Sequence, residues 1–152
     1  MWVVGRWAHH PADVSRLRHY RFDTVAEPNW NGSGDLQLLE VSIPGQTNYL
    51  EVLRGVAARA GHIARFTYDG VEDLALAMTE TASIVMRSDP RRVEAKLVIE
   101  TDHVEVETRG IDPNEEWPTP GMVTHTSWQI LLALCDELSL LDNGVAFRQL
   151  RR

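Results

Sequence analysis

The sequence has little cysteine and no long apolar run. Cys135 is the only cysteine, so an internal disulfide is excluded, and its apolar setting, L-L-A-L-C-D-E-L, predicts a buried reduced thiol. No stretch approaches the roughly 18 to 20 apolar residues that cross a membrane. The first residues, M-W-V-V-G-R-W-A-H-H, lack the apolar core of a signal peptide. We therefore expect a soluble protein of the reducing cytoplasm.

Positive charge is also scarce. The chain has 15 Lys and Arg against 22 Asp and Glu, and its formal net charge is -7 at pH 7. A protein that binds the phosphate backbone of nucleic acids needs a basic face that displaces counterions, so direct nucleic-acid binding is not expected. The 152 residues, 43% of them hydrophobic, suffice for one domain with a substantial core.

Residues 1–35 differ in composition from the rest. They are rich in tryptophan and histidine and end in the turn-rich N-W-N-G-S-G-D. We interpret them as an N-terminal extension: a flexible tail, an artefact of an upstream start site, or a partner-binding arm. His9 and His10 are adjacent, but no third ligand stands at a zinc spacing, so no metal site is predicted there. The folded domain is expected over residues 36–152.

Strands and helices alternate along that domain. Strands are predicted at 36–44, 93–99, 103–108 and 145–150, with a proline-rich loop at 110–121. One helix is capped by Thr47 or Asn48 and ends or is interrupted at Gly61, and a third is capped by Thr126 or Ser127 and runs through the apolar positions to Leu138. This order indicates an α+β fold, a two-layer sandwich with helices on one face of a mixed, mostly antiparallel sheet.

The segment 71–87, V-E-D-L-A-L-A-M-T-E-T-A-S-I-V-M-R, is the most informative. After Gly70, apolar residues recur at the spacing of a helix that packs on a core. The predicted buried stripe is Val71, Leu74, Ala75, Met78, Ala82, Val85 and Met86. Glu80 lies off this stripe and shares a helix face with Asp73, Leu76 and Ile84.

Three segments together resemble the RsbW-type anti-sigma factors, serine-protein kinases on the GHKL (Bergerat) ATP-binding fold. They are I-P-G-Q-T-N-Y-L-E-V-L-R, F-T-Y-D-G-V-E-D-L-A-L-A-M-T-E-T-A-S and A-L-C-D-E-L-S-L, and the resemblance covers residues 43–150. It implies a homodimer that sequesters an RNA polymerase sigma factor and is antagonised by an anti-anti-sigma (STAS) protein. In that family the first helix and strand form the dimer face and the neighbouring sigma contact, which here implies Asn48, Glu51 and Arg54.

The resemblance also implies an ATP cleft whose residues depart from the family pattern. Glu80 matches the general base, but Ile84 replaces an Asn that ligates Mg²⁺, and isoleucine has no lone pair for a hard cation. Thr108 and Gly110 stand where the family has D-x-G, whose Asp binds adenine. The glycine-rich phosphate turn falls at residues 125–128, where Trp128 would obstruct the phosphates.

These departures predict an anti-sigma module without a bound cofactor or metal. Efficient ATP turnover is not expected of it. Glu80 is then a solvent-facing or capping carboxylate of its helix. The alternative is an active serine kinase that binds Mg-ATP, uses Glu80 as base and phosphorylates its STAS antagonist. Two other residues have open roles: His125 is interpreted as a helix cap, and Trp117 either anchors an interface or folds back on the core.

Overall fold

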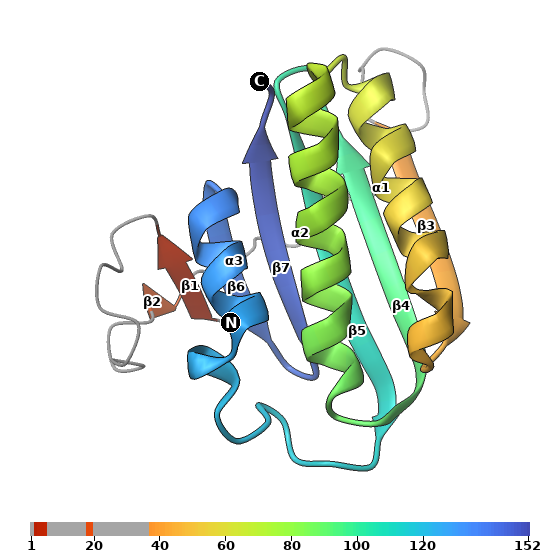
Figure 1. Cartoon of the computed structure of the whole chain (residues 1–152), viewed down its shortest axis with the longest axis vertical. Helices are drawn as coiled ribbons and strands as arrows, with labels where there is room; N and C mark the ends of the chain where they lie inside the picture. The colour runs from red at the N-terminus through yellow and green to blue at the C-terminus, as the bar shows by residue number, and fades with distance from the viewer. Residues whose placement is uncertain (1, 6–17, 20–36) are drawn as a thin grey trace.

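A computed structural model describes residues 2–5, 18–19 and 37–152 of the chain. It has two layers, with all the helices on one face of a single sheet (Figure 1). The described strands are β1 (Trp2–Gly5), β2 (Arg18–His19), β3 (Gln37–Pro44), β4 (Pro90–Ile99), β5 (His103–Pro113), β6 (Glu137–Leu141) and β7 (Gly144–Leu150). They form a seven-stranded sheet in the order β2-β1-β6-β7-β5-β4-β3. The predicted α+β sandwich is confirmed.

The sheet is antiparallel at every pairing between described strands, whereas we expected some parallel pairing. The predicted hairpin forms from β4 and β5, with Ile99 paired to Val104. β5 is longer than predicted, because Gly110 and Ile111 continue its pairing with β4 into the segment expected to be a loop. Asn143 has a left-handed φ of 57° in the tight turn between β6 and β7.

Three α-helices cover the sheet in the described part of the chain. They are α1 (Leu50–Ile63), α2 (Tyr68–Met86) and α3 (Thr126–Leu134), and short 3₁₀ turns precede two of them, η2 (Thr47–Tyr49) before α1 and η3 (Met122–Thr124) before α3. None of the helices in residues 37–152 combines the length and the apolar character of a membrane span.

The ends of α1 differ from the prediction. Neither Thr47 nor Asn48 caps it, because the N-cap positions are Gln46 for η2 and Tyr49 for α1, without side-chain cap hydrogen bonds. Gly61 does not end the helix but lies buried inside it, against α2. A Cβ at Gly61 would lie 3.1 Å from Cγ2 of Val71, so the glycine allows the two helices to approach closely.

α2 begins earlier than its apolar pattern indicates. Thr67 is the N-cap, and its hydroxyl accepts a hydrogen bond of 3.2 Å from the backbone N–H of Gly70, so Gly70 lies in the first turn rather than before the helix. All seven residues of the predicted stripe are buried, which confirms the face that packs on the sheet. The helix ends at Met86, before Asp89 and Pro90 turn the chain into β4.

The third helix is much shorter than predicted. It ends at Leu134, Cys135 is extended (φ -87°, ψ 141°), and Leu138 lies in β6 paired with Phe147. A continuous apolar run fits a buried helix and a buried strand equally well, and here the pairing with β7 decides the outcome. The N-cap is His125, whose Nδ1 accepts from the N–H of Ser127 at 3.2 Å, so His125 has the capping role expected of it and neither Thr126 nor Ser127 is the cap.

The core lies between the helices and the sheet. Its largest fully buried apolar side chains include Trp128, Phe147, Leu53, Leu74, Met78, Ile84 and Leu97. The thiol of Cys135 is buried and unbridged, as predicted, and burial raises its pKa.

The turn between α1 and α2 is a Schellman motif with an unusual residue in it. Arg65 occupies the left-handed position with φ 59°, while the N–H of Phe66 bonds to the carbonyl of Gly61 at 2.9 Å and that of Arg65 to the carbonyl of His62 at 3.1 Å. Glycine normally takes this position because it has no Cβ.

Replacing Arg65 with glycine should therefore stabilise the protein. We expect Arg65→Gly to raise the free energy of unfolding by about 0.5 to 1 kcal/mol, because the left-handed conformation no longer costs energy. Arg65→Ala is the control, since it removes the same side chain and keeps the Cβ. Urea unfolding measures both. If Arg65→Ala raised the free energy of unfolding by the same amount, the effect would come from loss of the arginine side chain rather than from the backbone conformation.

Candidate functional site

The candidate base, Glu80, lies on the outward side of α2. Its side chain is half-exposed, and within the described part of the chain it has no ion pair or hydrogen bond. Ile84, one turn later, is 0% exposed and belongs to the hydrophobic core. The helix thus presents one carboxylate to solvent and, at the position where a metal ligand was sought, a hydrocarbon side chain packed against its neighbours.

Thr108 and Gly110 lie on β5, beneath α2. Thr108 is 0% exposed, and its hydroxyl is 3.9 Å from Sδ of Met78. A Cβ at Gly110 would lie 3.2 Å from Cγ1 of Val85, so this glycine lets β5 and α2 pack closely. Met78 and Glu80 are two positions apart on α2, and such residues point away from each other. Thr108 therefore faces the opposite side of α2 from Glu80, and the structure does not bring these two together.

Residues 125–128 begin α3 instead of forming a phosphate-binding loop. Trp128 is 2% exposed and lies in the core. These side chains do not fit Mg-ATP: Ile84 offers no oxygen to a cation, Thr108 is enclosed by the core, and the indole of Trp128 occupies packed space. Their arrangement stabilises the layer between α2, α3 and the sheet.

Trp117 folds back on the protein. Its Nε1–H donates a hydrogen bond of 2.7 Å to the carbonyl of Leu141, and the half-buried ring packs against the core. Of the two roles that the sequence left open, packing is therefore the one observed. The loop that carries Trp117 is held to the end of β6 by this bond.

The residues suggested for a dimer or sigma contact lie in η2 and in the first half of α1. Asn48 and Glu51 are exposed. Arg54 points toward α2, where its Nη2 pairs with Oε2 of Glu72 at 2.9 Å. The structure thus places Asn48 and Glu51 on a free surface and uses Arg54 to connect two helices, a pairing between distant segments that sequence spacing does not reveal.

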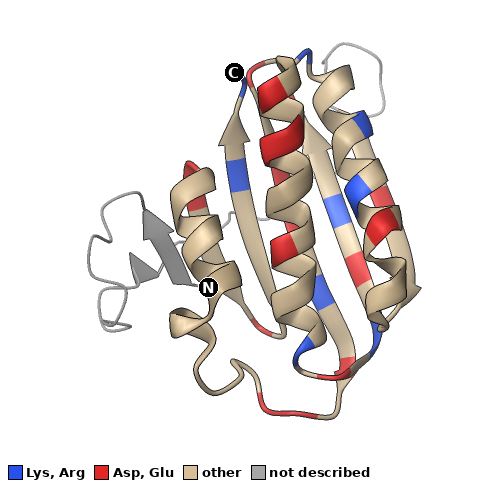
Figure 2. Cartoon of the chain, in the orientation of Figure 1, with Lys and Arg blue, Asp and Glu red and all other residues tan. Residues whose placement is uncertain are grey.

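The exposed side of the helix layer is acidic along α2. This helix has four acidic residues and no basic one: Asp69, Glu72, Asp73 and Glu80. Figure 2 shows red segments along α2. α1 carries charges of both signs. A negative potential along α2 favours the approach of a basic partner and increases its association rate.

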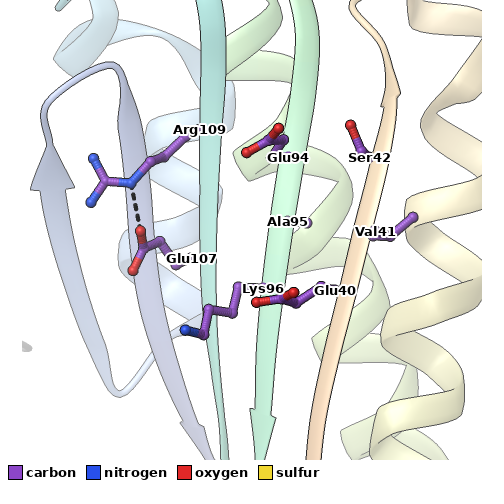
Figure 3. Close-up of a pocket in the computed structure, with 8 residues that line it drawn as sticks. All are labelled: Glu40, Val41, Ser42, Glu94, Ala95, Lys96, Glu107 and Arg109. Atoms are coloured by element: carbon purple, nitrogen blue, oxygen red, sulfur yellow. Dashed lines mark hydrogen bonds and ion pairs between the residues drawn. The ribbon is translucent and has the colours of Figure 1, made fainter. Parts of the chain in front are cut away.

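The opposite face of the sheet carries charged side chains, and no helix within residues 37–152 covers it. A hollow of about 360 Å³ lies there over β3, β4 and β5 (Figure 3), lined by Glu40, Val41, Ser42, Glu94, Ala95, Lys96, Glu107 and Arg109. The order and register of the strands show which of these residues are neighbours. In register, Lys96 lies between Glu40 and Glu107.

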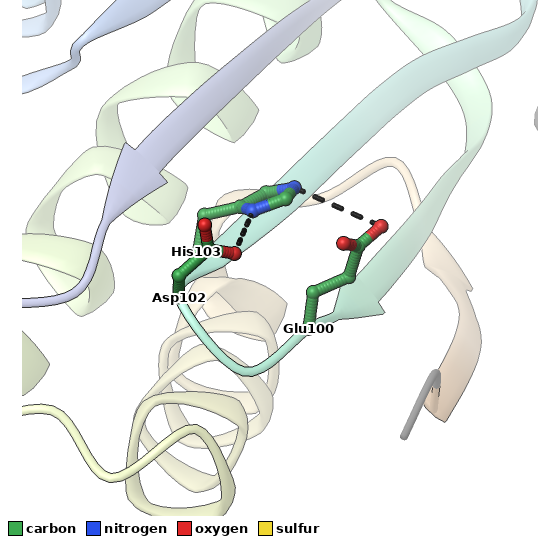
Figure 4. A group of neighbouring side chains, drawn as sticks. All are labelled: Glu100, Asp102 and His103. Atoms are coloured by element: carbon green, nitrogen blue, oxygen red, sulfur yellow. Dashed lines mark hydrogen bonds and ion pairs between the residues drawn. The ribbon is translucent and has the colours of Figure 1, made fainter. Parts of the chain in front are cut away.

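Three potential metal ligands, Glu100, Asp102 and His103, lie together at the turn between β4 and β5 (Figure 4). Nδ1 of His103 lies 2.7 Å from Oδ1 of Asp102, and Nε2 lies 3.8 Å from Oε1 of Glu100. The hydrogen bond from His103 lowers the pKa of Asp102. Carboxylate and imidazole groups can bind cations, but here they contact one another and stabilise the turn.

Comparisons with known proteins agree in part with the resemblance drawn from the sequence. The chain is similar to anti-sigma-F factor RsbW of Mycobacterium tuberculosis. In both strains CDC 1551 and H37Rv the identity is 26% over 111 residues, which is 72% of this chain and 64% of that protein. The chain thus spans less than two thirds of the length of these relatives. No family model matches it.

The predicted site residues thus fall into three separate places. Thr108 and Gly110 are in the interior, and Glu80 lies on the outward side of α2. Asn48 is in η2, and Glu51 and Arg54 follow in the first half of α1. The sequence analysis missed the outer-face pair Glu40 and Glu94. Only the register of β3 against β4 could have identified them as neighbours.

Proposed function

We propose that this protein is an anti-sigma factor that sequesters an RNA polymerase sigma factor and is itself antagonised by an anti-anti-sigma protein with a STAS domain. The similarity to anti-sigma-F factor RsbW over 111 residues carries the proposal. The three quoted segments and their order in an α+β sandwich support it, and so does the acidic surface of α2, since a sigma factor's DNA- and polymerase-binding surfaces are basic.

The proposed module works without efficient ATP turnover. On a degenerate GHKL fold, Ile84, Thr108 and Trp128 would occupy the positions of the metal ligand, the adenine contact and the phosphate loop. Phosphoryl transfer depends almost entirely on positioning and on charge stabilisation, and a packed hydrocarbon interior supplies neither. Inhibition by sequestration needs only a surface and a matching partner.

The contact surface we propose begins at Asn48 and Glu51. Both side chains are exposed, Asn48 in η2 and Glu51 in the first turn of α1. The same end of α1 serves a homodimer in this proposal, so that two copies present a composite surface to one sigma factor. Arg54 pairs with Glu72 of α2 and is partly exposed, so it stays in the proposed contact surface and also orients α1 against α2.

Reversing the charge at Glu51 tests this surface. We expect Glu51→Arg to weaken sigma binding about tenfold, which corresponds to about 1.4 kcal/mol, because it removes an attraction and introduces a repulsion toward a basic partner. Binding is measured by surface plasmon resonance against each sigma factor encoded in the same genome, and sedimentation velocity reports the dimer.

Glu116→Arg is the matched control, since it makes the same change of charge at an exposed position of the loop after β5. Arg54→Glu is unsuitable alone, because it also opposes Glu72 and disturbs the helix pair. Equal affinities of the two charge-reversed variants would show that the contact lies elsewhere. If no sigma factor binds the unaltered protein, the function itself is wrong.

A further inference from the structure

The turn between β4 and β5 brings three ionisable side chains to one face of the sheet. The turn is tight, and the backbone N–H of Glu100 bonds to the carbonyl of His103 at 3.0 Å. Side chains that face each other across an antiparallel turn lie on the same side, and so do those two apart along a strand. Val104 and Val106 of β5 belong to the core under the helices. Glu100, His103 and Glu105 therefore share the opposite face.

His103 presents an unpartnered nitrogen within this group. Its side chain is only 13% exposed, and Nε2 is a buried atom without a hydrogen-bond partner in the described part of the chain. The other ring nitrogen, Nδ1, lies 2.7 Å from Oδ1 of Asp102. When Nδ1 donates its proton to that carboxylate, Nε2 carries the lone pair, which is the form in which histidine binds metal ions. A ligand at Nε2 would satisfy a buried polar atom that otherwise lacks a partner.

Two carboxylates surround that nitrogen at the spacing of metal ligands. Nε2 of His103 lies 3.4 Å from Oε1 of Glu105 and 3.8 Å from Oε1 of Glu100, and Figure 4 shows the second of these contacts. Zinc bonds to nitrogen and oxygen measure about 2.0 to 2.2 Å, so two ligand atoms on a tetrahedral ion lie about 3.4 Å apart. An ion between Nε2 and the two carboxylates would therefore require only small movements of these side chains.

The charges around this group favour a cation. Within the described part of the chain, no lysine or arginine forms an ion pair with Glu100 or Asp102. The guanidinium of Arg148 is shared by two carboxylates, since its Nε bonds to Glu105 at 2.9 Å and its Nη1 to Glu137 at 3.1 Å. A carboxylate has about four lone-pair sites, so Glu105 can keep this bond and still ligate an ion.

We propose that Glu100, His103 and Glu105 bind a divalent transition-metal ion, with Zn²⁺ as the best fit, through Nε2 and the two carboxylates. Asp102 does not contact the ion but holds the imidazole ring in orientation. Imidazole nitrogen suits zinc, whereas Mg²⁺ and Ca²⁺ take oxygen ligands. Water completes the coordination of an ion with three protein ligands.

This site is separate from the surface proposed for the sigma factor and does not depend on that function. It lies at the tip of the β4–β5 hairpin, on the face of the sheet away from α1 and α2. No metal ligand is predicted there from the sequence, because the pairing of β4 with β5 is what brings these side chains together.

Calorimetric titration of the full chain with ZnCl₂, after dialysis against a chelator, tests the proposal. The titration is repeated with a variant that carries both His9→Ala and His10→Ala, so that this adjacent pair cannot account for the binding. We expect both proteins to bind one Zn²⁺ at the hairpin with micromolar affinity, and to bind Mg²⁺ at least tenfold more weakly.

Substitutions of the ligands, made in the variant without the adjacent histidines, identify the site. His103→Ala and Glu100→Gln should each weaken Zn²⁺ binding at least tenfold, because each removes a ligand. The matched controls are His62→Ala and Glu116→Gln, which make the same changes at exposed positions outside the cluster and should leave the affinity unchanged. Circular dichroism verifies that each variant is folded.

Asp102→Asn distinguishes positioning from ligation. It should weaken Zn²⁺ binding about tenfold and leave the visible absorption bands of bound Co²⁺ in place, because the ligands of the ion are unchanged. Shifted bands would overturn the positioning role of Asp102.

Three results would overturn the proposal itself: no saturable binding of Zn²⁺ by the variant without the adjacent histidines, unchanged affinity in His103→Ala, or equal affinity for Mg²⁺. The cluster would then be a set of ion pairs that only stabilises the turn. A loss in His62→Ala as large as that in His103→Ala would also overturn it, because the ion would then bind elsewhere.

Discussion

Replacing Trp128 with alanine is expected to lower the free energy of unfolding by about 3 to 5 kcal/mol, the usual cost of removing a buried aromatic side chain. Trp128 is 2% exposed and lies near the start of α3, a helix of nine residues. A helix this short depends on tertiary packing for its stability, so the loss should extend to the whole helix. Urea unfolding followed by far-ultraviolet circular dichroism measures the change.

Trp117→Phe is the matched control for Trp128→Ala. It keeps an aromatic ring and removes the hydrogen bond to the carbonyl of Leu141, so we expect a loss of about 1 kcal/mol. A loss below 1 kcal/mol for Trp128→Ala would contradict its assignment to the core. If the smaller side chain instead gave the protein micromolar affinity for Mg-ATP, the indole would be blocking a nucleotide site that the fold still contains.

The second large effect concerns Ile84. Ile84→Asn, which restores the residue of the kinase pattern, should destabilise the protein by about 2 to 4 kcal/mol, because it removes apolar packing and buries an amide without partners. Ile84 is 0% exposed. Its conservative counterpart, Ile84→Val, should cost only about 0.5 to 1.5 kcal/mol. Thermal and urea unfolding give both values.

Calorimetric titration with Mg²⁺ and a nonhydrolysable ATP analogue completes this experiment. We expect no binding by the unaltered protein and none by Ile84→Asn at a temperature where that variant is folded. Micromolar binding by the unaltered protein would support the serine-kinase alternative and make Glu80→Ala the next variant to assay. Binding gained only by Ile84→Asn would show that the cleft is intact and lacks one ligand.

The parts of the fold that the sequence predicts are those in which local pattern and tertiary environment agree. The stripe from Val71 to Met86 is buried because a helix on a sheet has one apolar face, and the β4–β5 hairpin forms where alternation brackets a tight turn. Prediction failed at Leu138, where an apolar run fits either element and β7 pairs with it as a strand. Gly61 was misjudged because its role is to admit another helix.

The sequence predicts only those properties of the candidate site that follow from one side chain alone. That Ile84 cannot ligate a cation follows from its side chain alone. The partnership of Arg54 with Glu72 and the nearness of Glu40 to Glu94 depend on which segments the fold places side by side. The spacing of residues along the sequence does not predict such contacts between distant segments.

The single lysine of the chain has a practical consequence. Lys96 lies on the outer face of the sheet, in the row between Glu40 and Glu107. Apart from the α-amino group, it is the only amine that an N-hydroxysuccinimide ester can acylate. A fluorophore attached there reports directly from the hollow beside β3 without any engineered residue. Protection of this one amine from acylation would report that a bound molecule covers the outer face.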